Sequence, residues 1–151
     1  MTLEQRLEQD IKTALLAGEK TRVITLRGLK SNLLNVKVAE GKRESGLSDQ
    51  EVINIFSKEA KKRQESADLY VQGGSQERAD KELVEKTVIE EYLPKQLSEA
   101  EIASIVAEVI TETGATEQRD MGKVIAGVRA KTAGSADGSI IARLTKEKLT
   151  Q

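Results

Sequence analysis

Apolar residues recur at every third or fourth position along almost the whole chain, which is the spacing of one face of an α-helix. Leu3, Leu7, Ile11 and Leu15 show this spacing near the N-terminus, and Ile141, Leu144 and Leu149 continue it near the C-terminus. The aromatic content is only 2%, so the core must be built from Leu, Ile, Val and Ala, as is usual in helical bundles. No segment shows the two-residue alternation of a strand, and we therefore predict an all-α fold.

Capping signals and glycines predict where the helices begin and end. Thr2 with Gln5, Ser48 with Glu51, and Ser98 with Glu101 have the spacing of capping boxes. Four helices are expected before Pro94, over residues 3–17, 20–39, 49–72 and 76–92. Three shorter helices are expected after it: one ends at Gly114, one ends near Gly134, and one begins at an Asp137 cap.

The change in helix length at Pro94 suggests two parts. We expect an N-terminal helical hairpin assembly over residues 1–93, followed by a small three-helix module over residues 95–151. A chain of 151 residues is long enough to bury a core without disulfides or metals.

The chain has no histidine and no cysteine. General-base catalysis near neutral pH, thiolate catalysis and Cys/His zinc sites therefore lose their usual side chains. We expect no catalytic residues, no metal and no cofactor, and look for function in the binding surfaces.

Nothing in the sequence marks the chain for export or for insertion in a membrane. No apolar run approaches the roughly 20 residues that span a bilayer, and the N-terminus lacks the basic and apolar regions of a signal peptide. We expect a cytoplasmic location.

The net charge of -1 hides two basic stretches. Residues 12–43 hold eight basic and two acidic residues, and residues 118–151 hold seven basic and three acidic ones. The candidates for phosphate contact in the second stretch are Lys123, Arg129, Lys131, Arg143 and Lys146. The alternative is that both stretches are ordinary solvated helix faces.

Three other motifs favour structural interpretations. Gly73-Gly74-Ser75 lacks the Gly-Lys-Ser/Thr ending of a P-loop, so a turn between helices is expected. Glu90-Glu91 has no histidine partner and is expected to lie on a solvated face. Lys61-Lys62-Arg63 is expected to pair locally with Glu59 and Glu65 rather than with phosphate.

The segment Met121-Gly122-Lys123-Val124, with Gly134 and Ala136-Asp137-Gly138, has the most specific pattern in the chain. We expect Gly122 to let a neighbouring backbone come close and Gly134 to end a helix in the left-handed conformation. Packing does not account for Lys123, which lies near a predicted helix N-terminus where an anion could bind.

These motifs, together with Tyr92-Leu93-Pro94-Lys95-Gln96-Leu97-Ser98 and Lys61-Lys62-Arg63-Gln64-Glu65-Ser66, resemble the GatB/YqeY domain family, and in particular its stand-alone YqeY-like members. The resemblance implies an all-helical protein whose C-terminal module is similar to the tail domain of the tRNA-dependent amidotransferase B subunit. In that subunit the tail contacts tRNA, and the chemistry takes place elsewhere. A label of carbon-nitrogen ligase activity with glutamine as amide donor would therefore be inherited from the larger subunit.

The leading functional hypothesis is a non-catalytic adaptor of translation that binds tRNA or another structured RNA. Two alternatives remain open. The chain could be a protein-interaction module that docks on an amidotransferase or aminoacyl-tRNA synthetase subunit, or it could be an accessory subunit in transamidation.

Overall fold

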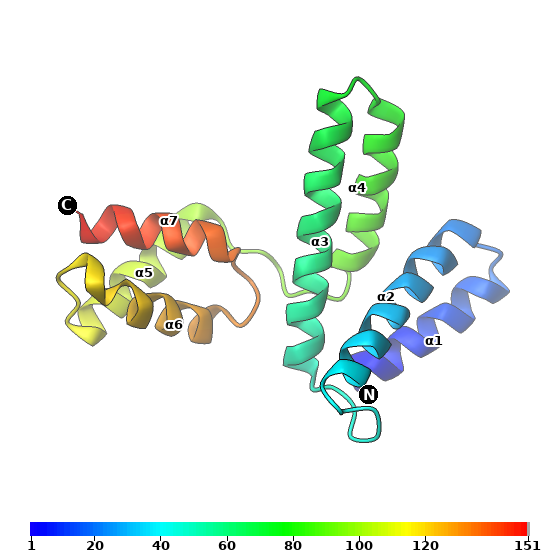
Figure 1. Ribbon diagram of the computed structural model, residues 1–151, viewed down its shortest axis with the longest axis horizontal. Helices are drawn as coiled ribbons and strands as arrows, with labels where there is room; N and C mark the ends of the chain where they lie inside the picture. The colour runs from blue at the N-terminus through cyan, green and yellow to red at the C-terminus, as the bar shows by residue number, and fades with distance from the viewer. Residues whose placement is uncertain (151) are drawn as a thin grey trace. The chain divides into compact units, whose positions relative to one another are not determined.

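The computed structural model describes residues 1–150 and confirms the all-α class, with no strand in that range. Seven α-helices and one short 3-10 helix follow one another along the chain (Figure 1). They are α1 (Leu3–Leu16), α2 (Lys20–Ala39), α3 (Asp49–Gln72), α4 (Gln76–Glu90), α5 (Glu99–Thr113), η1 (Gln118–Asp120), α6 (Met121–Thr132) and α7 (Gly138–Leu149).

The predicted caps account for most of the helix ends. Thr2 and Ser48 form complete capping boxes with Gln5 and Glu51. At Ser98 the structure has one half of the expected box: the Ser98 hydroxyl accepts a hydrogen bond from the Glu101 N–H. Helix α5 ends at Gly114, whose φ of 69° is the left-handed conformation that glycine adopts without strain.

The chain divides into two compact units, Met1–Leu93 and Pro94–Gln151, and each has a hydrophobic core of its own. The N-terminal core is centred on Leu7, Leu26, Val52, Phe56 and Ile89, all of them almost fully buried. The C-terminal core is centred on Ile102, Val106, Val124, Val128 and Ile141.

The N-terminal unit is made of two helical hairpins. Helices α1 and α2 form the first, and α3 and α4 form the second. Buried alanines such as Ala67 of α3 and Ala79 of α4, exposed by 1% and 0%, let the second pair pack closely. The end of this hairpin around Gly73-Gly74 projects beyond α1 and α2 (Figure 1), so these two glycines form a turn between helices, as expected.

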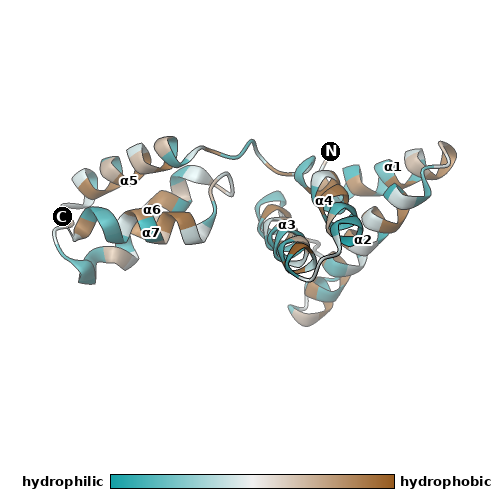
Figure 2. Cartoon of the chain, turned by 90° about the horizontal axis from the view of Figure 1, so that it is seen from above, coloured by the Kyte–Doolittle hydropathy of each residue, from teal (hydrophilic) through white to brown (hydrophobic). Residues whose placement is uncertain are grey.

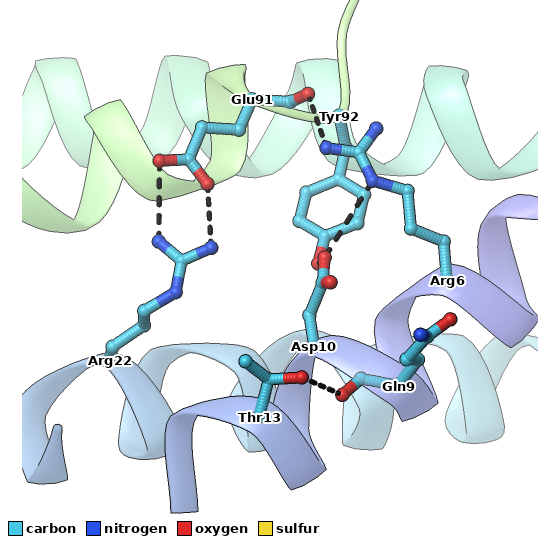
Figure 3. A network of polar contacts seen from close by, with 7 residues as sticks. All are labelled: Arg6, Gln9, Asp10, Thr13, Arg22, Glu91 and Tyr92. Atoms are coloured by element: carbon cyan, nitrogen blue, oxygen red, sulfur yellow. Dashed lines mark hydrogen bonds and ion pairs between the residues drawn. The ribbon is translucent and has the colours of Figure 1, made fainter. Parts of the chain in front are cut away.

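Tyr92 joins the end of α4 to α1 and is 3% exposed. Its hydroxyl donates a hydrogen bond to Asp10 (Figure 3). Its ring lies edge-on to Phe56, with 5.6 Å between the ring centroids. Burial, with the help of Asp10, raises the Tyr92 pKa well above its usual value. The Arg6 guanidinium lies 4.5 Å from the centre of the ring.

Glu91 adds a second connection at the same place. Its carboxylate accepts two hydrogen bonds from Arg22 of α2, at 3.2 and 2.7 Å, and its carbonyl accepts one from Arg6 (Figure 3). Glu90 and Glu91 are both exposed, as the sequence predicts, and Glu91 is in addition part of a bidentate ion pair between elements, which is a structural role.

The basic triplet of α3 differs in part from its prediction. Lys62 pairs with Glu59 at 3.4 Å, as expected. Arg63 does not pair within α3: its Nη1 lies 2.9 Å from Glu82 and 3.3 Å from Glu85, both on α4. The expected local pairing therefore does not hold for Arg63, because the neighbouring helix supplies two carboxylates.

In the C-terminal unit α5, α6 and α7 pack against one another, and hydrophobic and hydrophilic residues alternate around each helix (Figure 2). The turn between α6 and α7 is tied to the segment before α5, since the Leu97 N–H donates to the Ser135 carbonyl at 2.8 Å. Helix α6 ends in the left-handed conformation, with φ of 45° at Ala133 and 91° at Gly134.

The close approach that the sequence suggests for Gly122 occurs elsewhere. Gly122 is exposed, and a Cβ placed on it would meet nothing within 4 Å. A Cβ placed on Gly127 would lie 2.7 Å from Cγ1 of Val109 on α5. The prediction for Gly122 is therefore wrong, because the position that faces α5 lies more than one turn further along α6.

Candidate nucleic-acid interface

All five predicted phosphate contacts lie on α6 and α7, and all five side chains are exposed. Helix α6 carries Lys123, Arg129 and Lys131, and α7 carries Arg143 and Lys146. These residues differ in how strongly carboxylates of the same unit already hold them.

Lys131 is held by two carboxylates of α5. Its Nζ lies 2.8 Å from Glu108 and 2.8 Å from Glu112, which are one helical turn apart. The hydrogen bond to Glu108, followed by the one to Glu112, raises the Lys131 pKa, and the same bond lowers the Glu108 pKa. A phosphate would have to replace these carboxylates.

Arg143 is also paired. Its Nη2 lies 2.5 Å from Glu99, at the start of α5, and its Nη1 lies 3.3 Å from Glu147, one turn further along α7. The hydrogen bond to Glu99 is the main reason that the Arg143 pKa is raised. Lys131 and Arg143 therefore fasten α6 and α7 to α5.

Lys123 is held more loosely, with its Nζ 3.7 Å from Asp120. Asp120 accepts hydrogen bonds from the N–H groups of Thr116 and Glu117, and these bonds lower its pKa. The Asp120 carboxylate thus orders the turn before α6, and the Lys123 ammonium stays half exposed beside it.

The guanidinium of Arg129 and the ammonium of Lys146 form no hydrogen bond or ion pair with any residue in 1–150. Arg129 reaches the start of α7, where its Nη2 would lie 2.9 Å from a Cβ placed on Gly138. The Asp137 side chain caps that helix by accepting from the Ser139 N–H at 2.7 Å. Arg129 and Lys146 are therefore the candidates whose charge is most available to a ligand.

The charge of the whole C-terminal unit explains why the candidates differ. Residues 94–151 contain eight basic and eight acidic residues, and four of the acidic ones (Glu99, Glu101, Glu108 and Glu112) lie on α5, which has no basic residue. Basic residues outnumber acidic ones after residue 118 in the sequence, but carboxylates of α5 neutralise much of this charge in the folded unit. Pairs between helices cannot be recognised from runs along the chain, so sequence reasoning missed them.

The first basic stretch shows the same pattern. Arg22, Lys30, Lys37 and Lys42 pair with carboxylates, whereas Lys12, Lys20, Arg27 and Arg43 have no such partner within residues 1–150.

A family model described as "Yqey-like protein" matches residues 4–149. The chain belongs to the Yqey-like family. The match covers both units, so the resemblance inferred from the motifs around Pro94 and Met121 is confirmed.

Two relatives of this Yqey-like chain have the same name, "Altered inheritance of mitochondria protein 41, mitochondrial". The protein of Eremothecium gossypii is 31% identical over 87 residues, which are 58% of this chain and 46% of that protein. The protein of Lachancea thermotolerans is 30% identical over 109 residues, which are 70% of this chain and 57% of that protein. The chain spans about half the length of these relatives.

Within residues 1–150 no group of three or more Asp or Glu side chains is placed to hold a metal ion. None of the helices in this range is both long enough and apolar enough to cross a membrane.

Proposed function

We propose that this Yqey-like protein is a non-catalytic adaptor whose C-terminal unit binds the phosphate backbone of tRNA or of another structured RNA. The proposal depends on two exposed cations, Arg129 on α6 and Lys146 on α7, which have no carboxylate partner within residues 1–150. Binding of phosphate to such cations releases counterions without first breaking an ion pair.

The other three candidates have graded roles in this proposal. Lys123 adds a third phosphate contact once its ammonium leaves the Asp120 carboxylate, which lies 3.7 Å away. Lys131 and Arg143 contribute less, since each already has two carboxylate partners. Recognition is of backbone shape, because two tyrosines and one phenylalanine offer few surfaces for base stacking.

The resemblance to the amidotransferase tail domain supports tRNA as the RNA and a cytoplasmic location as the place of action. We propose that the chain assists transamidation as an accessory protein and does not catalyse it. Addition of the protein to a purified tRNA-dependent amidotransferase should then change the rate or the tRNA affinity. An unchanged rate and an unchanged affinity would remove the link to transamidation and leave RNA binding to be judged separately.

RNA binding is tested by fluorescence anisotropy of labelled tRNA at several salt concentrations, with double-stranded DNA as a control. We expect the protein to bind tRNA more tightly than DNA. We also expect the logarithm of the binding constant to fall linearly with the logarithm of the salt concentration, which is a negative salt slope. The double variant Arg129→Glu/Lys146→Glu should weaken binding and reduce that slope by about 0.7–0.9 for each lost phosphate contact. The pair Lys131→Gln/Arg143→Gln should have the smaller effect.

The matched control is Lys58→Glu/Lys81→Glu, which changes the net charge by the same amount on the α3–α4 hairpin, where both lysines are exposed. If this control weakens binding as much as the α6–α7 variant does, total charge and not the proposed interface determines affinity. Equal affinity for tRNA and DNA would likewise argue against the proposal.

Docking on a protein partner, the second candidate function, is favoured by a different observation: Ile24 and Val84 are exposed by 69% and 54% beside a groove of the N-terminal unit. Docking on an amidotransferase or synthetase subunit predicts co-purification that survives nuclease treatment.

A further inference from the structure

A groove runs between α2 and the α3–α4 hairpin of the N-terminal unit. It has two adjoining parts, of about 290 and 360 Å³, and Thr25 lines both of them. Helix α2 forms one wall with Lys20, Ile24 and Gly28, and α4 forms the other with Val84 and Val88. Figure 1 shows α2 lying beside α4 in this unit.

The groove is apolar at its floor and along its edges. The buried residues Leu29, Val88 and Ile89 form the floor, where they also belong to the core. Ile24 and Val84 are exposed by 69% and 54% at the edges. The core does not use these two side chains, because α2 turns Val23, Leu26, Leu29 and Leu33 inward and α4 turns Ala79, Val88 and Ile89 inward. Single exposed apolar residues are common on proteins, but these two line the same groove as buried apolar residues, as is usual where a ligand inserts apolar groups.

On the α2 wall the charge beside the groove is positive where it is not already neutralised. All five carboxylates in residues 1–40 pair with a basic side chain: Glu4, Glu8, Asp10, Glu19 and Glu40. In the same range Lys20, which lines the groove, and Arg27, next to Gly28, have no partner among the described residues. An occupant with both apolar and acidic groups complements this surface.

The other charged groups in the groove are already engaged. Arg22 holds Glu91, and Arg63 holds Glu82 and Glu85. A phosphate backbone would therefore meet one available cation within the groove and would leave the apolar side chains of Ile24 and Val84 exposed to water. A concave site with apolar edges fits inserted side chains better than it fits a flat lipid surface.

We propose that the groove between α2 and α4 binds an amphipathic helix of a partner protein, with apolar side chains at i, i+3 or i+4, and i+7 between Ile24 and Val84 and with acidic residues facing Lys20 and Arg27. This site is in the N-terminal unit and shares no residue with the proposed RNA contacts. Its test can fail or succeed without affecting the RNA proposal.

The probe is a fluorescein-labelled synthetic peptide of about 18 residues, which is five helical turns. It carries leucines at helical spacing and glutamates on the other face. Two control peptides keep its length: one has lysine in place of every glutamate, and the other has the same composition with the leucine stripe scrambled. We expect the full chain to bind the acidic amphipathic peptide in the micromolar range, and both controls at least about tenfold more weakly.

Variants of the protein locate the site. Ile24→Glu and Val84→Glu should each weaken peptide binding by about tenfold or more, and Lys20→Glu should weaken it severalfold. Val71→Glu is the matched control, because Val71 is exposed by 52%, close to the 54% of Val84, but lies near the far turn of the α3–α4 hairpin. Far-ultraviolet circular dichroism checks that each variant is folded.

Several results would overturn the inference. The acidic peptide could fail to bind at millimolar concentration, the basic peptide could bind equally well, or the groove variants could bind like the parent protein. Vesicles of phosphatidylserine and phosphatidylcholine that retain the parent but not Ile24→Glu would assign the surface to a membrane instead. Displacement of the bound peptide by tRNA would assign the groove to the RNA site.

Discussion

The packing of the C-terminal unit depends on one residue that has no side chain. At Gly127 a methyl group would lie 2.7 Å from Val109, well inside ordinary van der Waals contact. Val109 is 1% exposed and belongs to the core, so it has little room to move. Glycine is required at position 127 because α5 and α6 lie too close together for a side chain. The backbone there is not left-handed and would by itself accept other residues.

Gly127→Ala should therefore destabilise the C-terminal unit by about 1–3 kcal/mol, the usual cost of overpacking. Gly122→Ala makes the same chemical change in the same helix, at an exposed position with nothing within 4 Å of the new Cβ. It should leave the unit unchanged or stabilise it by up to about 1 kcal/mol, because alanine favours the helix. Urea unfolding followed by circular dichroism measures both. Equal effects of the two substitutions would contradict this account.

Glu4 shows how one carboxylate makes stability depend on pH. Burial acts to raise its pKa, but hydrogen bonds from Lys37 Nζ and the Leu47 N–H, both at 2.8 Å, outweigh burial and lower the pKa below 4.5. The folded protein thus binds this proton less tightly than the unfolded chain does. The resulting stability is present above pH 4.5 and is lost as the pH falls through the folded-state pKa.

Glu4→Gln should lower the free energy of unfolding at pH 7 by about 1 kcal/mol, as the ion pair with Lys37 becomes a neutral contact. The difference between variant and parent should shrink as the pH falls below 4.5 and through the lowered folded-state pKa of Glu4, because the parent then loses this charge as well. Denaturant titrations at several pH values measure the loss of unfolding free energy at pH 7 and its decrease at lower pH. The control is Glu44→Gln, at an exposed loop position in the same unit. If the stability difference between Glu4→Gln and the parent stayed constant with pH, Glu4 would not be a source of the pH dependence of stability.

At the scale of elements, the helices of the N-terminal unit differ in what they bury. Helix α1 buries one face, through Leu7, Ile11 and Ala14. Helix α2 buries one face in the same way. Both helices also expose apolar side chains, Leu15 and Leu16 at the end of α1 and Ile24, Leu34 and Val38 along α2. The α3–α4 hairpin relies on small residues, so its helices approach more closely than leucines would allow. These differences leave the groove beside α2.

The α3–α4 hairpin provides a test at this scale. Ala79→Leu should destabilise the N-terminal unit by about 1–3 kcal/mol, because Ala79 is fully buried and its neighbours cannot take up three more carbon atoms. Ala39→Leu, at the exposed end of α2, should change stability by less than about 0.5 kcal/mol. Thermal unfolding of the two variants checks the difference. Tolerance of leucine at Ala79 would mean that the hairpin is not closely packed there.

At the scale of the whole molecule, each unit has its own core and its own set of ion pairs. We expect the fragments 1–93 and 94–151 to fold separately, each with a helical spectrum and a cooperative thermal transition. Domains of about 55–65 residues often fold alone but are marginally stable, so the C-terminal fragment should melt at the lower temperature. A fragment without a cooperative transition would show that its stability depends on the rest of the chain.

Much of the fold follows from short-range signals that a sequence displays directly. Helical spacing gave the all-α class, and Thr2, Ser48, Gly114 and Asp137 marked helix ends, because caps act within one turn of the chain. The same reasoning failed for Arg63, whose partners on α4 are about twenty positions away. A partner on another helix leaves no local signal.

The sequence by itself determined the helices, their caps and the lack of histidine and cysteine, since these depend on residue type and on spacing within a turn. Only the tertiary structure decided that Gly127 and not Gly122 meets α5, and that Glu99, Glu108 and Glu112 neutralise Arg143 and Lys131 while Arg129 stays available. Close approach and charge pairing act between helices across space. They are therefore fixed by which faces meet, and the order of residues along the chain does not reveal that.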